Sequence, residues 1–82
     1  MIATELELQA FTGLPKHLKQ VAACLALGCT NKEIGLSVGI SYETIRAYKI
    51  RLYEAVGIHD GLKLAVFIVR HPQIEKMLRE SL

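Results

Sequence analysis

The side chains best placed to do chemistry lie on one side of a helix predicted over residues 42–56. Counted at about 100° per residue from Ile45, that side carries Glu43, Arg46, Ala47 and Ile50. The small Ala47 would let the helix approach base edges closely, and an exposed Ile50 could touch a thymine methyl group. The pattern predicts a surface that reads base edges in a major groove, although basic residues on an amphipathic helix also occur simply as a solvated face.

Other side chains of the same helix could contact a phosphate backbone. Lys49 lies at the flank of the predicted buried face, where its long stem can carry the ammonium group to a phosphate. The hydroxyl of Tyr42 or Tyr53 could also reach a phosphate. Tyr48 is instead expected to pack in the core with its hydroxyl near the surface.

Two helices and a tight turn must position these side chains. Thr30 and Glu33 predict a capping box at the start of a helix over 31–38, and Gly39 ends that helix. After one more residue, Ser41 predicts the N-cap of the second helix. The core face of the second helix is predicted to comprise Ile45, Tyr48, Leu52, Ala55 and Val56. Two helices joined by Gly-Ile-Ser predict a helix-turn-helix, whose second helix enters a major groove.

The flanking segments are also predicted to be helical, which gives an all-α fold. Residues 15–27 carry apolar side chains at helical spacing, and Gly28 is placed for a left-handed C-cap. Asp60 can cap a helix from Gly61 to about Arg70 that is apolar nearly all round, so it must be covered on both sides.

Short helical segments are expected at both ends of the chain. In residues 1–13, Thr4 and Glu7 fit a capping box. The residues of this segment that could share one face are Leu6, Ala10 and Phe11. Residues 72–82 form an amphipathic closing helix. Its predicted apolar stripe comprises Ile74, Met77, Leu78 and Leu82.

Composition narrows the class of protein. The 82 residues are too few for the layered α/β enzyme folds, and with 51% hydrophobic residues they are too apolar for a disordered tail. Charge is uneven: residues 1–13 sum to −2, whereas residues 14–71 carry eight Lys and Arg against four Asp and Glu. The positive charge therefore lies where the helix-turn-helix is predicted, as binding to phosphate requires. A mean hydropathy of +0.29 predicts an exposed apolar face that meets a partner.

No catalytic, metal or cofactor site is predicted. Cys24 and Cys29 have no further ligands at zinc-site spacing, so we expect reduced, packed thiols. The acidic start of the chain is unlike a secretory signal, and the longest charge-free stretch, 20–31, is far short of the roughly 20 apolar residues of a membrane span. We expect a cytoplasmic protein that is not an enzyme and has no small-molecule ligand, no cofactor and no membrane contact.

The run from Leu14 to Ile58, and more loosely to His71, resembles the LuxR/FixJ/GerE-type DNA-binding domain. The matching marks are Gly28, Asn31-Lys32-Glu33-Ile34, Gly39-Ile40-Ser41, Thr44-Ile45, Lys49, Leu52 and Val56-Gly57-Ile58. The resemblance implies a four-helix domain whose third helix reads the major groove and whose fourth helix forms the dimer seam. It also implies that Thr44 supports the helix start and a backbone contact, and that Arg46 and Lys49 touch DNA.

Several residues depart from that family's usual pattern. Gln20 and Leu18 stand where acids are common, Tyr48 where His is common, and Glu43 where Lys is common. Lys63 replaces an acid near the start of the fourth helix. Leu18 is expected in the core, with a surface altered for protein contact as the alternative.

These observations lead to one hypothesis and one rival. The chain is predicted to be a freestanding regulator with an N-terminal extension (1–13), a LuxR-type domain (14–71) and a C-terminal helix (72–82), which binds double-stranded DNA as a homodimer. The residues expected to contact DNA are Lys32, Tyr42, Glu43, Thr44, Arg46, Ala47, Lys49 and Ile50, and those at the dimer seam are Leu62, Ala65, Val66, Phe67 and Val69. The rival is an anti-activator that uses this fold to bind and block a larger LuxR-type regulator or another protein.

Overall fold

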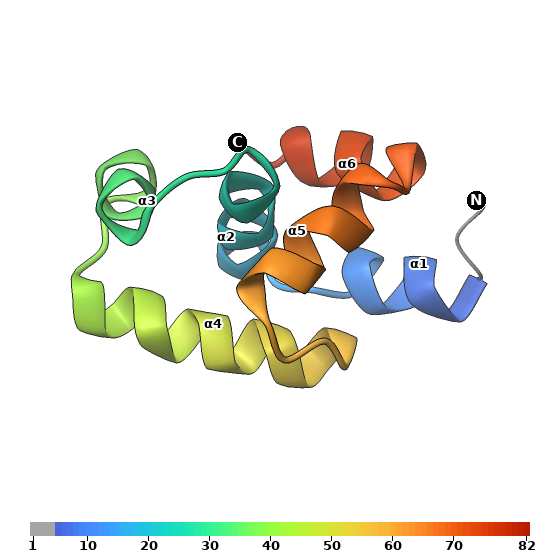
Figure 1. Cartoon of the computed structure of the whole chain (residues 1–82), viewed down its shortest axis with the longest axis horizontal. Helices are drawn as coiled ribbons and strands as arrows, with labels where there is room; N and C mark the ends of the chain where they lie inside the picture. The colour runs from blue at the N-terminus through green and yellow to red at the C-terminus, as the bar shows by residue number, and fades with distance from the viewer. Residues whose placement is uncertain (1–4) are drawn as a thin grey trace.

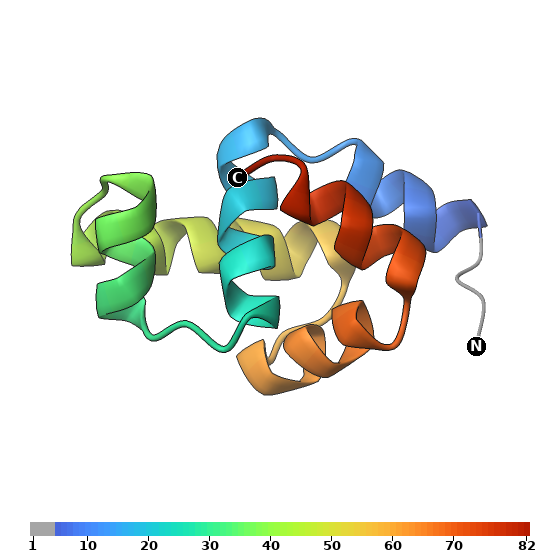
Figure 2. The ribbon, with the colours of Figure 1, turned by 90° about the horizontal axis from the view of Figure 1, so that it is seen from above.

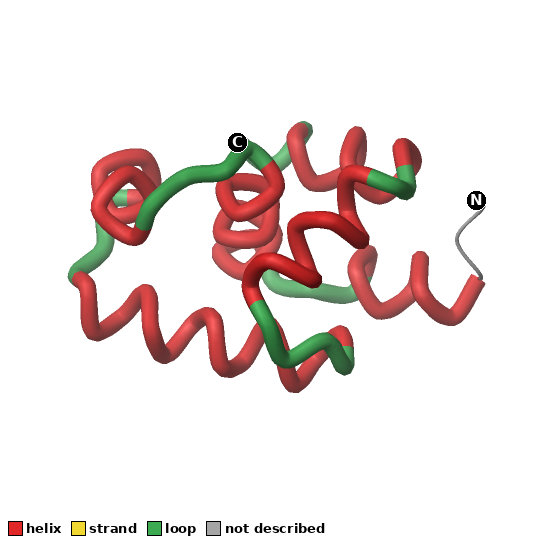
Figure 3. The backbone as a smooth tube through the Cα atoms, viewed as in Figure 1, coloured by secondary structure: helices red, strands yellow, loops and turns green. Residues whose placement is uncertain are grey.

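The computed structural model describes residues 5–82, which form six helices joined by short turns (Figure 1). The helices are α1 (Glu5–Thr12), α2 (Lys16–Ala26), α3 (Asn31–Val38), α4 (Tyr42–Val56), α5 (Gly61–Val69) and α6 (Pro72–Arg79). This part of the chain contains no strand (Figure 3), which confirms the predicted all-α class. None of the helices over 5–82 is long and apolar enough to cross a membrane.

α2 is the central element of the fold. It packs against α3, α4, α5 and α6, as the view from above shows (Figure 2). A helix covered from several sides must be apolar around much of its circumference. The buried residues of α2 are accordingly Leu18, Val21, Ala22, Ala23, Cys24 and Leu25. Leu18 therefore belongs to the core, and the alternative of an altered surface at this position is wrong.

The terminal helices α1 and α6 complete the core of a single chain. α1 packs against α4 and α6, and α6 packs against α2 and α5. From α1, the buried ring of Phe11 stacks on Phe67 of α5 with ring centroids 5.8 Å apart. From α6, Ile74 and Leu78 are buried. The Gln20 side-chain amide on α2 donates to the Ser81 carbonyl at 3.1 Å and holds the end of the chain in place.

Two apolar residues of the terminal segments lie outside the core, contrary to prediction. Leu6 is exposed, because five residues along a helix turn it about 140° away from Phe11. Leu82 is exposed because α6 ends at Arg79, after which the Ser81 hydroxyl donates to the Leu78 carbonyl at 2.5 Å. The capping box predicted at Thr4 lies outside the described residues.

The helix ends follow the capping residues in the sequence. The Thr30 hydroxyl accepts from the Glu33 amide at 3.2 Å, and the Thr30 amide donates to the Glu33 carboxylate at 2.9 Å, which confirms the capping box of α3. Hydrogen bonding of the Glu33 carboxyl to the Thr30 backbone amide, and then to the Thr30 side chain, lowers the pKa of Glu33. Ser41 caps α4 and Asp60 caps α5 through side-chain oxygens. The start of each helix in the 30–61 stretch is thus fixed locally.

Replacing Thr30 with alanine is expected to destabilise the fold, because the buried face of α3 depends on a helix that begins at the correct residue. A lost N-cap costs about 1 kcal/mol, which for a domain of this size lowers the melting temperature by about 4–8 °C. Thermal unfolding followed by circular dichroism measures the shift. Ser37→Ala is the matched control, because Ser37 is exposed on the same helix and should change stability by less than about 0.5 kcal/mol. Equal effects of the two substitutions would contradict the role of the cap.

The cysteines meet at the turn that closes α2. Gly28 adopts a left-handed φ of 81°, the Gly28 amide donates to the Leu25 carbonyl and the Cys29 amide donates to the Cys24 carbonyl, both at 3.0 Å. This is a Schellman motif, which brings the side chains around the turn together. Both thiols are free, and burial, reinforced by the adjacent Cys29, raises the pKa of Cys24. Among residues 5–82, no group of three or more His, Cys, Asp or Glu could hold a metal ion.

Candidate nucleic-acid interface

α3 and α4 form the predicted helix-turn-helix at one end of the molecule (Figure 1). Gly39 ends α3 with a left-handed φ of 77°, and Ser41 begins α4 two residues later. Gly35 makes the close approach possible: a Cβ atom there would lie 3.0 Å from the Ile40 carbonyl oxygen and 3.3 Å from Ile45 Cδ1. Sequence reasoning missed this role of Gly35, because only the folded turn shows how near Ile40 returns to α3.

The side of α4 opposite the core carries the side chains predicted to read bases. Ile45 and Leu52 are buried, which confirms the core face at these two positions, whereas Ala55, predicted on the same face, is exposed. On the outer side, Glu43, Arg46 and Ala47 are exposed, and Ile50 keeps 55% of its surface in solvent. We call Glu43, Arg46, Ala47 and Ile50 the reading face. An isoleucine exposed to this degree, next to an arginine, suits contact with bases in a groove.

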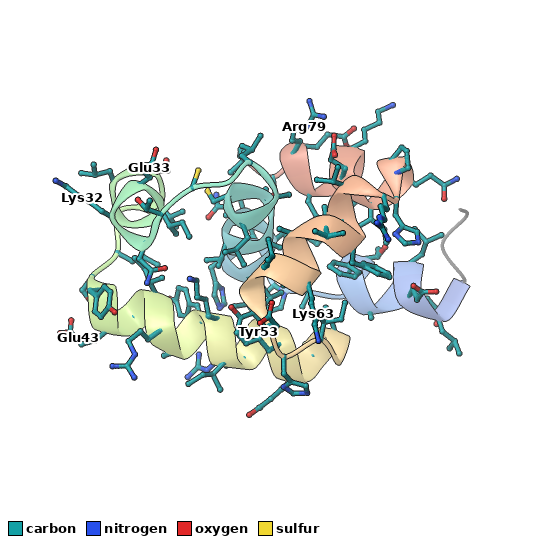
Figure 4. The ribbon with its side chains drawn as sticks, in the orientation of Figure 1. Lys32, Glu33, Glu43, Tyr53, Lys63 and Arg79 are labelled. Atoms are coloured by element: carbon teal, nitrogen blue, oxygen red, sulfur yellow. The ribbon has the colours of Figure 1, made fainter. Side chains whose placement is uncertain are left out.

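Charged side chains lie on and beside the first two turns of α4. Figure 4 shows Lys32 of α3 and Glu43 of α4 projecting outward at the same end of the molecule. Both residues are exposed, and Arg46 lies one turn further along α4. Among the described residues, neither Glu43 nor Arg46 has an ion-pair partner within 4.0 Å. Their charges are therefore available to a ligand.

The first turn of α4 is held by its own hydroxyl groups. Ser41 Oγ accepts from the Thr44 amide at 3.2 Å and lies 2.9 Å from the Thr44 hydroxyl. Through these contacts with Ser41, Thr44 supports the start of the helix, and its implied contact with the DNA backbone stays a prediction. Tyr42 is exposed beside Thr44, and its contact with a DNA backbone stays a prediction. A helix start fixed in this way gives the reading face a defined orientation.

In the protein without DNA, the Lys49 side chain links α4 to α3. Its side chain is half-buried, and Nζ donates to Asn31 Oδ1 at 2.5 Å. Burial lowers the pKa of Lys49. Asn31 is the first residue of α3, so this hydrogen bond ties the start of one helix to the middle of the other. The phosphate contact of Lys49 stays a prediction, and forming it would require the ammonium group to leave or share Asn31.

A double-mutant cycle is expected to show that Asn31 and Lys49 stabilise the fold as a pair. Lys49→Met keeps most of the aliphatic stem and removes the donor, and Asn31→Ala removes the acceptor. A partly exposed hydrogen bond to a charged group predicts a coupling energy of about 1 kcal/mol in the free energy of unfolding. Urea denaturation of the two single variants and the double variant measures it. Strictly additive losses would show that the two side chains do not stabilise each other.

Aromatic contacts hold the other flank of α4. The Tyr48 ring packs against the His17 ring of α2 with centroids 4.5 Å apart, and both side chains are half-buried. Tyr48 therefore lies at the edge of the core rather than deep within it. Tyr53, labelled in Figure 4, approaches the start of α5, where its hydroxyl would contact a Cβ at Gly61 at 3.0 Å. Burial, and then the negative charge of Asp60, raise the pKa of Tyr53.

The residues predicted at the dimer seam divide into two groups. Leu62, Val66 and Val69 are 75%, 40% and 52% exposed, whereas Ala65 and Phe67 are half-buried. Leu64 and Ile68 are fully buried on the opposite side of α5. We call Leu62, Val66 and Val69 the α5 strip. The helix is thus covered on one side within the chain and open on the other.

A groove of about 390 Å³ runs beside the α5 strip. Its lining residues are Leu62, Lys63, Val66, Phe67, Arg70 and His71. His71 is buried: its ring lies 4.2 Å from the Phe67 ring, and its Nδ1 lies 2.6 Å from the Phe67 carbonyl oxygen. Sequence reasoning gave His71 no role, because only folding brings it against Phe67.

The fold and the exposed face of α4 define a helix-turn-helix DNA-binding domain. Residues 14–68 match the family model described as GerE, bacterial regulatory proteins, luxR family. The chain therefore belongs to the LuxR family of bacterial regulatory proteins, whose members are DNA-binding regulators and not enzymes. The match covers α2, α3, α4 and nearly all of α5, and it leaves out α1 and α6. No curated protein and no solved structure matches the chain.

Proposed function

We propose that this protein is a sequence-specific DNA-binding transcription regulator that acts as a homodimer in the cytoplasm. The observation that carries the proposal is the reading face, which is exposed on a well-capped α4 within the family match. Recognition helices of this type lie in a major groove with their N-terminal residues on base edges. Exposure of Glu43 and Arg46 in the first two turns of α4 supports this placement.

The side chains around the start of α4 divide the work between bases and backbone. The reading face contacts base edges, while Lys32, Tyr42, Thr44 and Lys49 contact phosphate or sugar. Contacts to the backbone fix the register of a protein on DNA, and contacts to base edges carry the sequence information. The exposed ammonium group of Lys32 and the exposed ring of Tyr42 support this division.

The α5 strip supports the homodimer. A two-fold axis through α5 would place the same apolar patch on both sides of the interface. The second copy of the protein would then cover the open side of α5, as a helix that is apolar nearly all round requires. Two α4 helices related by such an axis would enter successive major grooves about one helical turn apart, so the operator is an inverted repeat.

The same strip favours a second candidate function. An exposed apolar helix face beside a groove can also receive the corresponding helix of another LuxR-type regulator, or of another protein. The protein would then act as an anti-activator that blocks its partner by forming a mixed dimer. Under this alternative, the chain binds a relative more tightly than it binds itself or DNA.

Random-site selection with the purified protein tests the proposal. We expect a palindrome whose half-sites lie about one helical turn apart, bound with an affinity that falls steeply with salt as phosphate counterions are released. Light scattering of the free protein should show a dimer. Failure to bind any duplex at low salt, with a monomeric chain that captures a LuxR-type regulator, would overturn the proposal in favour of the alternative.

A further inference from the structure

We propose that Glu43 selects a cytosine at the end of each half-site nearest the start of α4. The inference rests on the proposed function, because it assumes that the reading face enters a major groove. It assigns to one acidic side chain the chemistry of the base that it reads. The carboxylate would accept a hydrogen bond from the cytosine 4-amino group, the donor that cytosine presents in that groove.

Glu43 is not needed to build the helix on which it lies. An acid in the first turn can stabilise a helix by capping, as Glu33 does when its carboxylate accepts from the Thr30 amide. At the start of α4 the capping contacts are made by Ser41 and Thr44. Among residues 5–82, Glu43 forms no ion pair within 4.0 Å, although Arg46 lies three residues further along the same face. The carboxylate is thus exposed and open to an outside donor.

The negative charge of Glu43 disfavours binding in a groove, and this penalty makes the side chain selective for a particular base. Phosphates flank the groove and repel a negative charge, so Glu43 weakens binding to most sequences. Only a base that donates a hydrogen bond at the matching position offsets this loss. Cytosine and adenine both donate through an amino group, but adenine presents its N7 acceptor beside that donor and repels the carboxylate, so cytosine is preferred. A side chain that penalises wrong partners contributes to specificity even where it adds little affinity.

The spacing along α4 fixes where the cytosine lies relative to the other contacts. With a rise of about 1.5 Å per residue, Arg46 follows Glu43 by about 4.5 Å and Ile50 follows Arg46 by about 6 Å. One base-pair step is about 3.4 Å. Arginine most often reads guanine, so a guanine bound by Arg46 should lie about one base pair beyond the cytosine. The thymine methyl under Ile50 should lie about two base pairs further.

A change of the preferred base tests the assignment better than a loss of binding. Glutamine has the length of glutamate and pairs with adenine through its N6 and N7 atoms. Random-site selection should therefore return cytosine at this position for the wild type and adenine for Glu43→Gln, with the rest of the half-site unchanged. Competition between the two operators should show a reversal of preference of about tenfold.

Glu54→Gln is the matched control. Glu54 is exposed on the same side of α4, eleven residues beyond Glu43 and about 16 Å away along the axis. The Glu54→Gln substitution removes the same negative charge as Glu43→Gln, so both variants should bind random duplex slightly more tightly. Only Glu54→Gln should keep the wild-type preference for cytosine. Circular dichroism of both exposed-site variants confirms that they fold.

Each outcome bears on a distinct claim. Suppose that the wild type and Glu43→Gln select the same palindrome, with the same base at every position. That result would overturn the role of Glu43 and leave the proposed function intact. A shift of base preference in Glu54→Gln would overturn the assignment as well. If neither the wild type nor the variants bound any duplex, the proposed function would fail and the assignment would fail with it.

Discussion

Val66→Asp is expected to convert the proposed homodimer into a folded monomer. Val66 is the middle residue of the α5 strip and borders the groove between α5 and His71. In a two-fold symmetric dimer one substitution changes both sides of the interface, so two carboxylates would be buried close together. In the free chain, where Val66 keeps 40% of its surface exposed, the aspartate can stay in water. The variant should therefore fold.

The expected loss of association is large. Burying one unpaired charge costs about 3–5 kcal/mol, and symmetry doubles that cost. The dissociation constant of the dimer should rise by at least about 1,000-fold. Analytical ultracentrifugation of the wild type and the variant over a wide concentration range measures this change. Because two half-sites must be held together, operator binding should become weak and lose its dependence on a palindrome.

Leu36→Asp is the control for this experiment. Leu36 is also an exposed aliphatic residue, but it lies on α3, away from the α5 strip. The Leu36→Asp substitution introduces the same new carboxylate as Val66→Asp and should leave the dimer intact. If Val66→Asp remained dimeric, the seam would lie elsewhere. If the wild type were monomeric and Val66→Asp abolished capture of a LuxR-type regulator, the strip would instead serve the alternative function.

The helices could be predicted from sequence because local interactions set their ends. The capping box at Thr30, the N-cap at Ser41 and the left-handed glycines act within a few residues of where they stand. The predicted bounds of α3 and α4 are correct for the same reason. The exposed side of α4 followed from helical periodicity alone, once Ile45 was placed toward the core.

The contacts that orient the site could not be predicted in this way. The Lys49 ammonium group meets Asn31, 18 positions earlier in the chain, and Phe11 meets Phe67 across most of the sequence. Such pairs depend on the angles at which helices cross, which periodicity does not encode. The open side of α5 is a similar case: apolar residues occupy nearly all of its circumference, and only packing shows that Leu64 and Ile68 face inward.

Replacing Arg46 with alanine is expected to remove most of the sequence preference at one base pair of each half-site. An arginine that reads guanine does so through two hydrogen bonds, to O6 and N7. Losing such a contact costs about 1–3 kcal/mol of discrimination, or roughly 5-fold to 150-fold per half-site. Arg46 is exposed and has no ion-pair partner among the described residues, so its removal should leave the fold intact.

Arg51→Ala separates base reading from simple charge. Arg51 is also exposed on α4, but about 140° around the helix from Arg46, away from the centre of the reading face. Both substitutions remove one positive charge and should weaken binding to random duplex by a similar, small factor. Only Arg46→Ala should also lose its preference between two operators: the selected one and one in which the guanine is replaced. It should bind both almost equally well. Fluorescence anisotropy with both duplexes at two salt concentrations measures these affinities. A parallel loss on both duplexes for Arg46→Ala would show that Arg46 contacts phosphate, because a phosphate contact weakens binding uniformly across sequences.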